Sequence, residues 1–255
     1  MSVLVVIPAR YASVRFPGKP LAPLRGKPVI QHVYEQAARA EMDQVIVATD
    51  DQRIADAVAG FGGRAAMTSP AARSGTERVA EVARAGDASI IINIQGDEPL
   101  VRPDMVRPLA EFLERHAAVP MASLMTRLER PEDLASPNVV KVVVDRDGFA
   151  LYFSRAPIPY MRQETGDRRQ ADTSPVPCPP SQVWKHLGIY GYQRHFLLQF
   201  PHLDPTPLEQ REQLEQLRAL EHGYRIKMLE TAHDTIGVDT PEDLTRVERA
   251  MAGAR

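Results

Sequence analysis

The sequence contains very little cysteine. Cys178 is the only one in 255 residues, so the chain cannot close an internal disulfide and has no thiolate cluster for zinc. Aromatic residues make up only 6%, and 31 Lys and Arg side chains nearly balance 33 Asp and Glu side chains, which leaves a net charge of −2. Without a basic excess, the chain is not expected to bind nucleic acid or an anionic membrane surface. Any site for an anion must therefore be local.

Long hydrophobic runs are missing as well. Five apolar residues precede Pro8, too few for the core of a signal peptide, and no run approaches the ~20 residues that span a bilayer. The shares of apolar residues (44%) and charged residues (25%) are those of an ordinary globular protein. We therefore expect a soluble protein of the reducing cytoplasm, built as one large domain or two small ones.

Strand and helix patterns alternate along the first half of the chain. Short runs rich in β-branched residues at 3–7, 44–49 and 89–95 are typical of strands buried on both faces of a parallel sheet. The other elements expected here are strands near 64–67 and at 119–125, and helices from Pro28, after Asp51, at 76–85 and at 103–116. This order predicts an α/β fold with an open, mostly parallel sheet and helices on both faces.

The pattern changes after Pro131. Residues 139–145 and 149–155 flank an Asp-Gly turn and predict an antiparallel hairpin. The proline-rich residues 156–183 are expected to form a mobile loop. Beyond them the sequence predicts a strand at 185–193, a helix at 207–221, a strand at 224–229 and a closing helix at 241–252. No repeat and no interdomain linker interrupts these elements.

Three cations lie in the loop that follows the first strand. Arg10, Arg15 and Lys19 occupy a Pro- and Gly-rich segment at the carboxyl end of a strand, where open α/β sheets bind ligands. The segment has neither G-x-G-x-x-G nor a Walker A pattern. Two arginine forks and a lysine could neutralise a triphosphate. A solvated basic loop is the alternative, and the residues alone leave both interpretations open.

Two acidic segments are candidates for a metal site. The segment 95–99 ends the strongest predicted strand, and Asp239 directly precedes a helix that begins Thr-Pro-Glu-Asp. Two carboxylates, together with phosphate oxygens and water, form the all-oxygen site that Mg²⁺ prefers. An ordinary Gly-Asp turn and a helix cap are the alternative explanations for these acids.

Other polar residues have two interpretations each. The segment 74–77 is typical of a helix cap and also of a ligand-binding loop. Arg155 could pair with a substrate carboxylate or end a strand in solvent, and His186 lies in an apolar strand, where a buried core histidine is more common than a ligand. Glu212 and Gln216 lie opposite the leucines of the predicted helix 207–221, on a face that either binds hydroxyl groups or is solvated.

One family shares these segments along nearly the whole chain. The segment IPARYASVRFPGKPL (7–21) closely resembles the N-terminal signature of the cytidylyltransferases that activate 3-deoxy-D-manno-octulosonate (Kdo), the CMP-Kdo synthetases. The other similar segments, in the same order, are VATDD (47–51), SGTER (74–78), NIQGDEP (93–99), LYFSRAPIP (151–159), HLGIYGY (186–192), PLE (207–209), LEQLR (214–218) and GVDTPEDL (237–244). The usual Ser-Thr-Arg-Leu of the family is Ser13-Val14-Arg15-Phe16 here, which keeps the cations in place.

The resemblance implies a fold and an activity. The fold is a three-layer α/β/α nucleotidyltransferase fold, with a mostly parallel Rossmann-like sheet and a smaller antiparallel lobe for sugar binding and dimerisation. Residues 1–130 would mainly bind the nucleotide, 131–235 would form the sugar-binding and dimerisation lobe, and 236–255 the metal-ligand loop and closing helix of a single domain. The implied homodimer uses Mg²⁺ and transfers CMP from CTP to Kdo, an acidic 3-deoxy sugar, for lipopolysaccharide biosynthesis. Alternatives are a synthetase for neuraminate or 8-amino-Kdo, and a non-catalytic nucleotide sensor.

The resemblance also implies roles for individual residues. The residues implied to bind the nucleotide are Ala9, Arg10, Arg15, Lys19, Arg73, Ser74, Gly75, Gln95 and Asp97. Of these, Arg10, Arg15, Lys19 and Asp97 are implied to be catalytic. Those implied to bind the sugar are Gln95, Arg155, His186, Tyr190, Glu212 and Gln216. Asp97 and Asp239 are implied to bind the metal, whereas Glu98 and Asp243 are expected to be structural. These roles require Asp97, Asp239 and the basic loop to meet at one place.

Overall fold

The computed structural model of the chain describes residues 2–12, 15–160 and 183–253. Most of the stretch 156–183, for which a mobile loop is expected, lies outside these described residues. No helix within the described ranges combines the length and the apolar character needed to cross a membrane.

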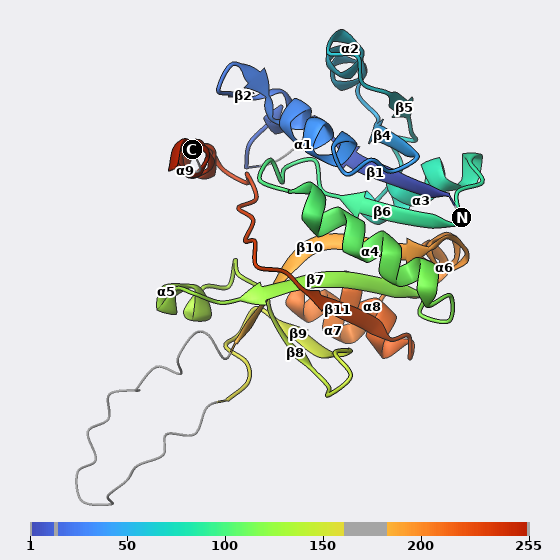
Figure 1. Cartoon of the computed structure of the whole chain (residues 1–255), viewed down its shortest axis with the longest axis vertical. Coiled ribbons are helices and arrows are strands. Elements are labelled where there is room, and N and C mark those ends of the chain that lie inside the picture. The colour runs from blue at the N-terminus through green and yellow to red at the C-terminus, as the bar shows by residue number, and fades with distance from the viewer. Residues whose placement is uncertain (1, 13–14, 161–182, 254–255) are drawn as a thin grey trace, which may run out of the picture.

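A nine-stranded sheet runs through the molecule (Figure 1). Its order is β11-β7-β10-β6-β1-β4-β5, and β8 pairs with both β10 and β9. The strands are β1 (Val3–Ala9), β4 (Gln44–Thr49), β5 (Ala65–Met67), β6 (Ile90–Ile94), β7 (Met121–Arg127), β8 (Lys141–Val144), β9 (Ala150–Ser154), β10 (Trp184–Gln193) and β11 (Ile226–Glu230). β2 (Pro23–Leu24) and β3 (Lys27–Pro28) form a separate small antiparallel sheet.

Most strands of the large sheet run in the same direction, although antiparallel pairs are as many as parallel ones. β1 is parallel to β4 and to β6, with Val6 opposite Asn93, and β11 is parallel to β7. β10 lies between β6 and β7 and is antiparallel to both. The expected hairpin is present as β8 and β9, and it joins the large sheet through β10. Apolar side chains of β1 alternate between the two faces, so both faces need a covering layer.

Helices supply these two layers. α1, α2 and α4 pack on one face, whereas α3, α6 and α8 pack on the other (Figure 1). The helices are α1 (Val29–Ala38), α2 (Gln52–Gly60), α3 (Gly75–Ala85), α4 (Pro103–Arg115), α5 (Pro131–Ala135), α6 (Arg194–Gln199), α7 (Pro207–Glu212), α8 (Gln216–Glu221) and α9 (Pro241–Gly253). The described residues also form two 3₁₀ helices, η1 (Lys19–Leu21) and η3 (Phe200–His202). The expected fold class is confirmed.

One expected element is wrong in its extent. The single helix expected at 207–221 is two short helices, α7 and α8, because Gln213 ends α7 in the left-handed region with φ +53°. The leucine spacing continues through this break, so it does not reveal the change of direction. α5 and α6 were not expected at all.

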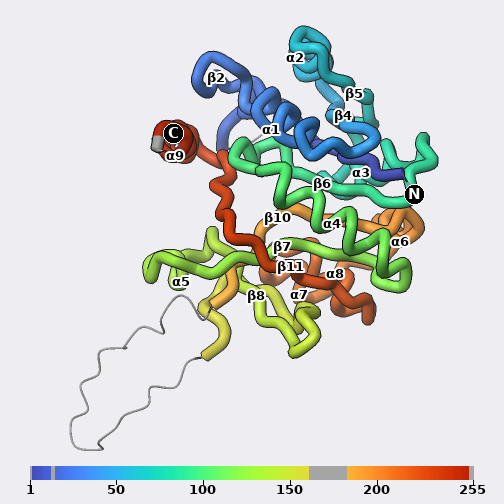
Figure 2. Tube along the Cα trace, in the orientation of Figure 1, coloured from blue at the N-terminus to red at the C-terminus, as the bar shows by residue number. Residues whose placement is uncertain are grey.

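The last helix returns to the loop that follows the first strand (Figure 2). Val238 and Val247 share a buried cluster with Ala22 and Leu24. Arg25 Nη1 donates a hydrogen bond to the Met251 carbonyl oxygen at 2.8 Å. The segment around Asp239 is thereby held beside the basic loop.

Candidate active site

The ends of β1 and β6 meet at the centre of the site. Gly96 N donates a hydrogen bond to the Pro8 carbonyl oxygen at 3.2 Å. A Cβ atom on residue 96 would lie 2.8 Å from that same oxygen, so glycine is required for this close approach. One strand end continues into the basic loop and the other into Asp97, which brings both motifs to one edge of the sheet.

Asp97 and Asp239 converge on one ammonium group. Lys19 Nζ donates to Asp97 Oδ2, and it lies 3.1 Å from Asp239 Oδ1. Arg15 Nη2 lies 3.0 Å from Asp239 Oδ2. A main-chain hydrogen bond of 2.8 Å from Val238 N to the Asp97 carbonyl oxygen holds the two segments together. The expected meeting of the two acids with the basic loop is therefore observed.

Lys19 is charged in this position. Burial of its side chain, which is 14% exposed, opposes the charge, but Asp97 and Asp239 outweigh that effect and raise the pKa of the ammonium group above its usual value. Because the carboxylates of Asp97 and Asp239 both contact the Lys19 ammonium group, their oxygen atoms lie close together. The sequence resemblance gives Lys19 to the triphosphate, and in this structure its ammonium group instead lies between the two acids.

The two carboxylates are suitable ligands for Mg²⁺. Among the described residues, no group of three or more His, Cys, Asp or Glu side chains could hold a metal ion. A divalent ion here would therefore take two protein carboxylates and complete its shell with water and phosphate oxygens, which is the usual way that Mg²⁺ binds with a nucleotide. The donor set fits this ion.

A cavity of about 620 Å³ opens beside the two acids; we call it the Asp97 cavity. The residues implied to bind the nucleotide all line it, namely Ala9, Arg10, Arg15, Lys19, Arg73, Ser74, Gly75, Gln95 and Asp97. Asp239 also lines it. The walls come from five segments, namely the end of β1 with the basic loop, the start of α3, the end of β6, Gln213 and Asp239.

A carboxylate already offsets the partial positive charge at the N-terminus of α3. Ser74 Oγ accepts a hydrogen bond from Glu77 N at 3.2 Å and donates one to Glu215 Oε1 at 2.6 Å. Glu215 therefore occupies the helix N-terminus, where an anion would otherwise be attracted. Because of this, phosphate groups are expected at the basic loop. Arg73 N already donates to Glu77 Oε2 at 2.8 Å, so this main-chain group is not available to a nucleobase.

A second cavity of about 490 Å³ lies next to the first; we call it the His186 cavity. His186, Tyr190 and Gln216, three of the residues implied to bind the sugar, line it. Arg15 and Asp239 line both cavities. A molecule in one cavity would consequently meet a molecule in the other beside the acids.

His186 is a neutral group with one free nitrogen. Its Nε2 lies 3.0 Å from Ser123 Oγ, and Ser123 Oγ donates to the Ile189 carbonyl oxygen at 2.9 Å. Because Ser123 donates its only hydroxyl hydrogen to the Ile189 carbonyl, His186 Nε2 must carry the imidazole hydrogen and donate it to Ser123 Oγ. His186 Nδ1 is then left as an acceptor. Burial lowers the pKa of His186 to about 3. This side chain could accept a hydroxyl hydrogen but could not attract a carboxylate.

Gln216 has a buried polar atom without a partner. Tyr190 Oη donates to Gln216 Oε1 at 3.2 Å, whereas Gln216 Nε2 has no hydrogen-bond partner among the described residues. A buried amide nitrogen that lacks a hydrogen bond is rare in proteins and costs free energy. Its place on the wall of the His186 cavity indicates a ligand that accepts this hydrogen bond.

Arg155 and Glu212 line neither cavity. The Glu212 carboxylate accepts hydrogen bonds from Ser154 Oγ at 2.6 Å and from Arg155 N at 2.9 Å. The Arg155 guanidinium donates to the main-chain carbonyls of Pro137 and Glu212 at 2.8 and 2.7 Å. The helix break at Gln213 separates Glu212 from Gln216, so the expected shared face does not exist. Both charged groups are bound by the protein itself.

Comparisons with known proteins identify the family of this chain. A family model described as cytidylyltransferase matches residues 4–227. The chain is 52% identical over 250 residues to the 3-deoxy-manno-octulosonate cytidylyltransferase of Geobacter sulfurreducens, with 97% of this chain and 98% of the relative covered. It is also 52% identical over 254 residues to the protein of the same name from Syntrophotalea carbinolica, with 99% and 100% covered. The chain belongs to the 3-deoxy-manno-octulosonate cytidylyltransferase family.

Solved structures support this membership. A structure of CMP:2-keto-3-deoxy-manno-octonic acid synthetase complexed with CTP is 43% identical, with a TM-score of 0.88 and all of both chains covered. The 4-diphosphocytidyl-2C-methyl-D-erythritol synthase of Anaerococcus prevotii is only 11% identical, with a TM-score of 0.61, and shares the fold alone. The family resemblance noticed in the sequence is thus confirmed.

The sequence analysis did not single out a buried lysine, Lys141. Lys141 is fully buried in β8, and its Nζ donates to the carbonyl oxygens of Ser136, Val139 and Arg155 at 2.9, 2.6 and 2.6 Å. Ser136 and Val139 line the His186 cavity, so Lys141 fixes part of its wall. The only signal in the sequence is one charged residue within a run of valines.

The His186 cavity also has a basic wall that no motif revealed. Arg130, Lys185 and Arg246 line it together with Arg15. Each of the three lies close to a carboxylate, at 2.7 Å from Asp133, 2.6 Å from Asp234 and 3.2 Å from Asp243 respectively. Arginine side chains keep further N–H groups for a ligand after pairing with one acid. Four acids, Glu98, Asp133, Asp239 and Asp243, line the same cavity, so an acidic ligand would bind through the N–H groups that the paired arginines keep.

Glu98 is a partly buried acid that lines this cavity, and its Oε2 atom is enclosed. Burial, together with the nearby charge of Asp97, raises the pKa of Glu98 to about 8. Its Oε1 approaches Gly237, where an added Cβ would lie 3.2 Å away. Asp243 caps α9 by accepting from Thr240 N at 3.0 Å. These contacts agree with the structural roles expected for Glu98 and Asp243.

We expect acid to destabilise the protein partly through His186. The unfolded chain takes up this proton near pH 6.5, whereas the folded chain does so only near pH 3, so stability is lost as the pH falls through that window. The loss is about 1.4 kcal/mol per pH unit, or roughly 2 kcal/mol at pH 5. Urea unfolding at pH 7.5 and pH 5 measures it. The His186→Gln variant should show a smaller difference between the two pH values, and the exposed His195→Gln control the same difference as the wild type. An unchanged difference in His186→Gln contradicts the assignment.

Proposed function

We propose that this chain transfers CMP from CTP to the anomeric hydroxyl of Kdo and releases pyrophosphate. The observation that carries the proposal is the pair of adjoining cavities that share Arg15 and Asp239. One cavity has the residues that suit a nucleoside triphosphate. The other has hydrogen-bonding groups for hydroxyls and a basic wall for an acid. The relatives of 52% identity are named for this activity, and a structure of 43% identity is described as complexed with CTP.

The reaction needs no covalent enzyme intermediate. The anomeric oxygen of the sugar forms a bond to the α-phosphorus while the bond from that phosphorus to the bridging oxygen of pyrophosphate breaks. The hydroxyl proton leaves to solvent, and the leaving pyrophosphate takes the electron pair. Positioning and charge stabilisation supply most of the acceleration in such transfers. Arg10 and Arg15, in the wall of the Asp97 cavity, would hold the phosphate oxygens.

Mg²⁺ is the proposed cofactor, with Asp97 and Asp239 as its protein ligands. When bound, the ion would offset phosphate charge and acidify the attacking hydroxyl. Lys19 keeps the two carboxylates at one point through its contacts with both. Its flexible four-carbon side chain could also reach a phosphate oxygen as a point charge.

The acceptor would lie in the His186 cavity. His186 Nδ1 and the free amide nitrogen of Gln216 would bind its hydroxyl groups, one as acceptor and one as donor. Arg130 and Lys185 would attract its carboxylate. These contacts would place the sugar beside Arg15 and Asp239, which line both cavities.

An acceptor screen tests the function. The purified chain with CTP and Mg²⁺ is given Kdo, neuraminate or 8-amino-Kdo in turn, and pyrophosphate release is followed. Kdo should give the largest kcat/KM, and EDTA should stop release until Mg²⁺ is restored. Preference for another sugar assigns the chain to that acceptor. Nucleotide binding without release for any sugar identifies a sensor.

Assembly and cellular role follow from the same proposal. We propose a homodimer formed through the β8–β9 hairpin, because Leu151 is 62% exposed there and an apolar side chain gains by burial. We also propose that the enzyme acts in the cytoplasm and supplies lipopolysaccharide synthesis. Light scattering of the wild type and of Leu151→Lys tests the dimer, since the charged variant should be monomeric.

A further inference from the structure

Glu215 joins the segment before α8 to the start of α3. Its Oε1 accepts from Ser74 Oγ at 2.6 Å, and its Oε2 accepts from Thr76 Oγ1. Thr76 is buried, whereas Ser74 and Glu215 are partly buried, so the bond to Thr76 is the better protected from competing water. Hydrogen bonds from hydroxyls to a carboxylate are among the stronger ones in proteins. Glu215 lies in the family-like segment LEQLR (214–218), but the resemblance implies no role for it.

The segment around Glu215 contacts both cavities. Gln213 lines the Asp97 cavity, whereas Leu214 and Gln216 line the His186 cavity. Ser74, which Glu215 holds, lines the Asp97 cavity. Four consecutive residues thus span the two sites, and the one whose carboxylate bonds to α3 stands directly before Gln216.

A second connection runs through the sheet. The Tyr192 side chain lies close to Thr76 and Asn93, and Gln95 Nε2 donates to Asn93 Oδ1 at 3.3 Å. Thr76 in turn donates to Glu215. These side chains therefore form a line of contacts from Gln95 in the Asp97 cavity to Glu215, the residue directly before Gln216.

We propose that Glu215 is a positioning residue that couples nucleotide binding to acceptor binding. The proposal rests on the proposed function, since it needs ligands in both cavities. A nucleotide that orders residues 73–75 fixes Ser74 and Thr76, and through them Glu215. Gln216 then already points into the His186 cavity when the acceptor arrives. Each ligand therefore lowers the ordering cost of the other, and the coupling must be reciprocal.

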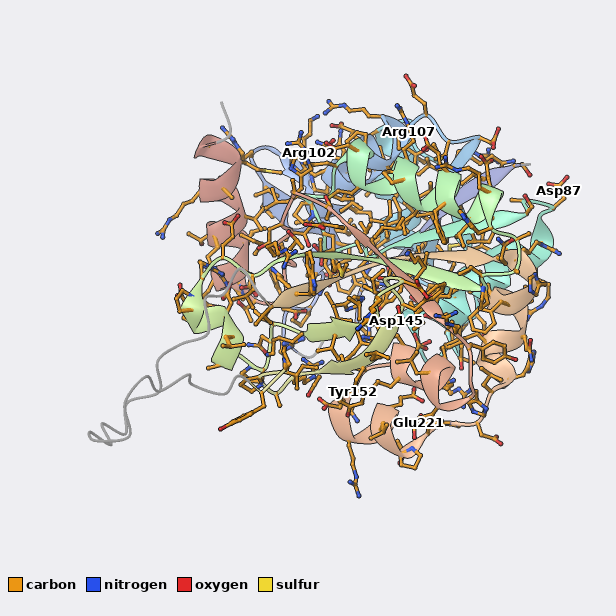
Figure 3. All side chains as sticks on the ribbon, turned by 60° about the horizontal axis from the view of Figure 1, so that its bottom comes forward. Asp87, Arg102, Arg107, Asp145, Tyr152 and Glu221 are labelled. Atoms are coloured by element: carbon orange, nitrogen blue, oxygen red, sulfur yellow. The ribbon has the colours of Figure 1, made fainter. Side chains whose placement is uncertain are left out.

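Binding measured without turnover tests the coupling. A CTP analogue with a methylene bridge between the α- and β-phosphorus cannot react, so calorimetry can compare Kdo affinity with and without it. The wild type should bind Kdo at least ~10-fold more tightly when the analogue is present. In Glu215→Gln this ratio should fall to about 1–2. Glu221→Gln, an exposed change at the far end of α8, should keep the wild-type ratio (Figure 3).

Thr76→Val provides an independent variant of nearly the same shape. It removes one hydroxyl from Glu215 and should also lower the ratio, and the double variant should lose no more than Glu215→Gln alone. If Glu215→Gln does not fold, Thr76→Val alone decides. A wild-type ratio near 1, or a folded variant that keeps the full ratio, overturns the proposal. A chain that binds the analogue but releases no pyrophosphate from CTP and any sugar contradicts the proposed function instead.

Discussion

Replacing Asp97 with Asn should lower kcat by at least ~10³-fold while the protein stays folded. Asn has nearly the same shape and can still accept the hydrogen bond from Lys19, but the pair of acids loses one of its two negative charges. The proposed Mg²⁺ site then has a single carboxylate. Because Asp97 is 26% exposed, the stability change should stay within ~1 kcal/mol. Pyrophosphate release and urea unfolding measure the two effects.

Two further variants make this result specific. Asp239→Asn should cause a loss of similar size, and the double variant should be little worse than either single one, because the two carboxylates act as a unit. The exposed Asp87→Asn, far from both cavities, should behave as the wild type (Figure 3). Retention of more than a tenth of the wild-type rate in Asp97→Asn contradicts the metal assignment.

The sheet and its helices could be predicted where local chemistry decides. The run 44–49 coincides with β4, and Asp51 caps α2 by accepting from Arg53 N, as its place before an apolar pattern predicts. The direction of β10, in contrast, could not be predicted from the sequence. An apolar run can pair in either direction, and insertion between β6 and β7 is decided by tertiary packing. The break at Gln213 has no signal either, because glutamine is not typical of a left-handed position.

The residues of the site also fall into two groups, those that local sequence predicts and those that it does not. Residues of the basic loop and Asp97 follow directly from strand ends, so one topological rule brings them together. Lys141 and Glu215 have roles that depend on contacts with segments far away in the sequence, which no local pattern encodes. Individual roles came from the family resemblance, and they stay predictions until variants are measured. The division into 1–130, 131–235 and 236–255 stays a prediction too.

Replacing Gly96 with Ala should damage both stability and activity. The added Cβ would lie 2.8 Å from the Pro8 carbonyl oxygen and 3.3 Å from both Ala9 Cβ and Ile30 Cδ1. The closest of these is main chain of a central strand, so the ends of β1 and β6 must move apart. Overpacking of this kind costs about 1–3 kcal/mol. Arg10 and Asp97 follow these two strand ends, and a shift approaching 1 Å should lower kcat/KM by ~10²-fold.

Gly60→Ala is the matched control for this change. Gly60 is the last residue of α2, and nothing lies within 4 Å of a Cβ added there. Alanine favours a helix over glycine by roughly 0.5–1 kcal/mol, so this variant should be as active as the wild type and slightly more stable. Urea midpoints and pyrophosphate release compare the two variants directly. Wild-type behaviour of Gly96→Ala would show that the contact with Pro8 can relax, and that the two strand ends do not set the separation between the basic loop and Asp97.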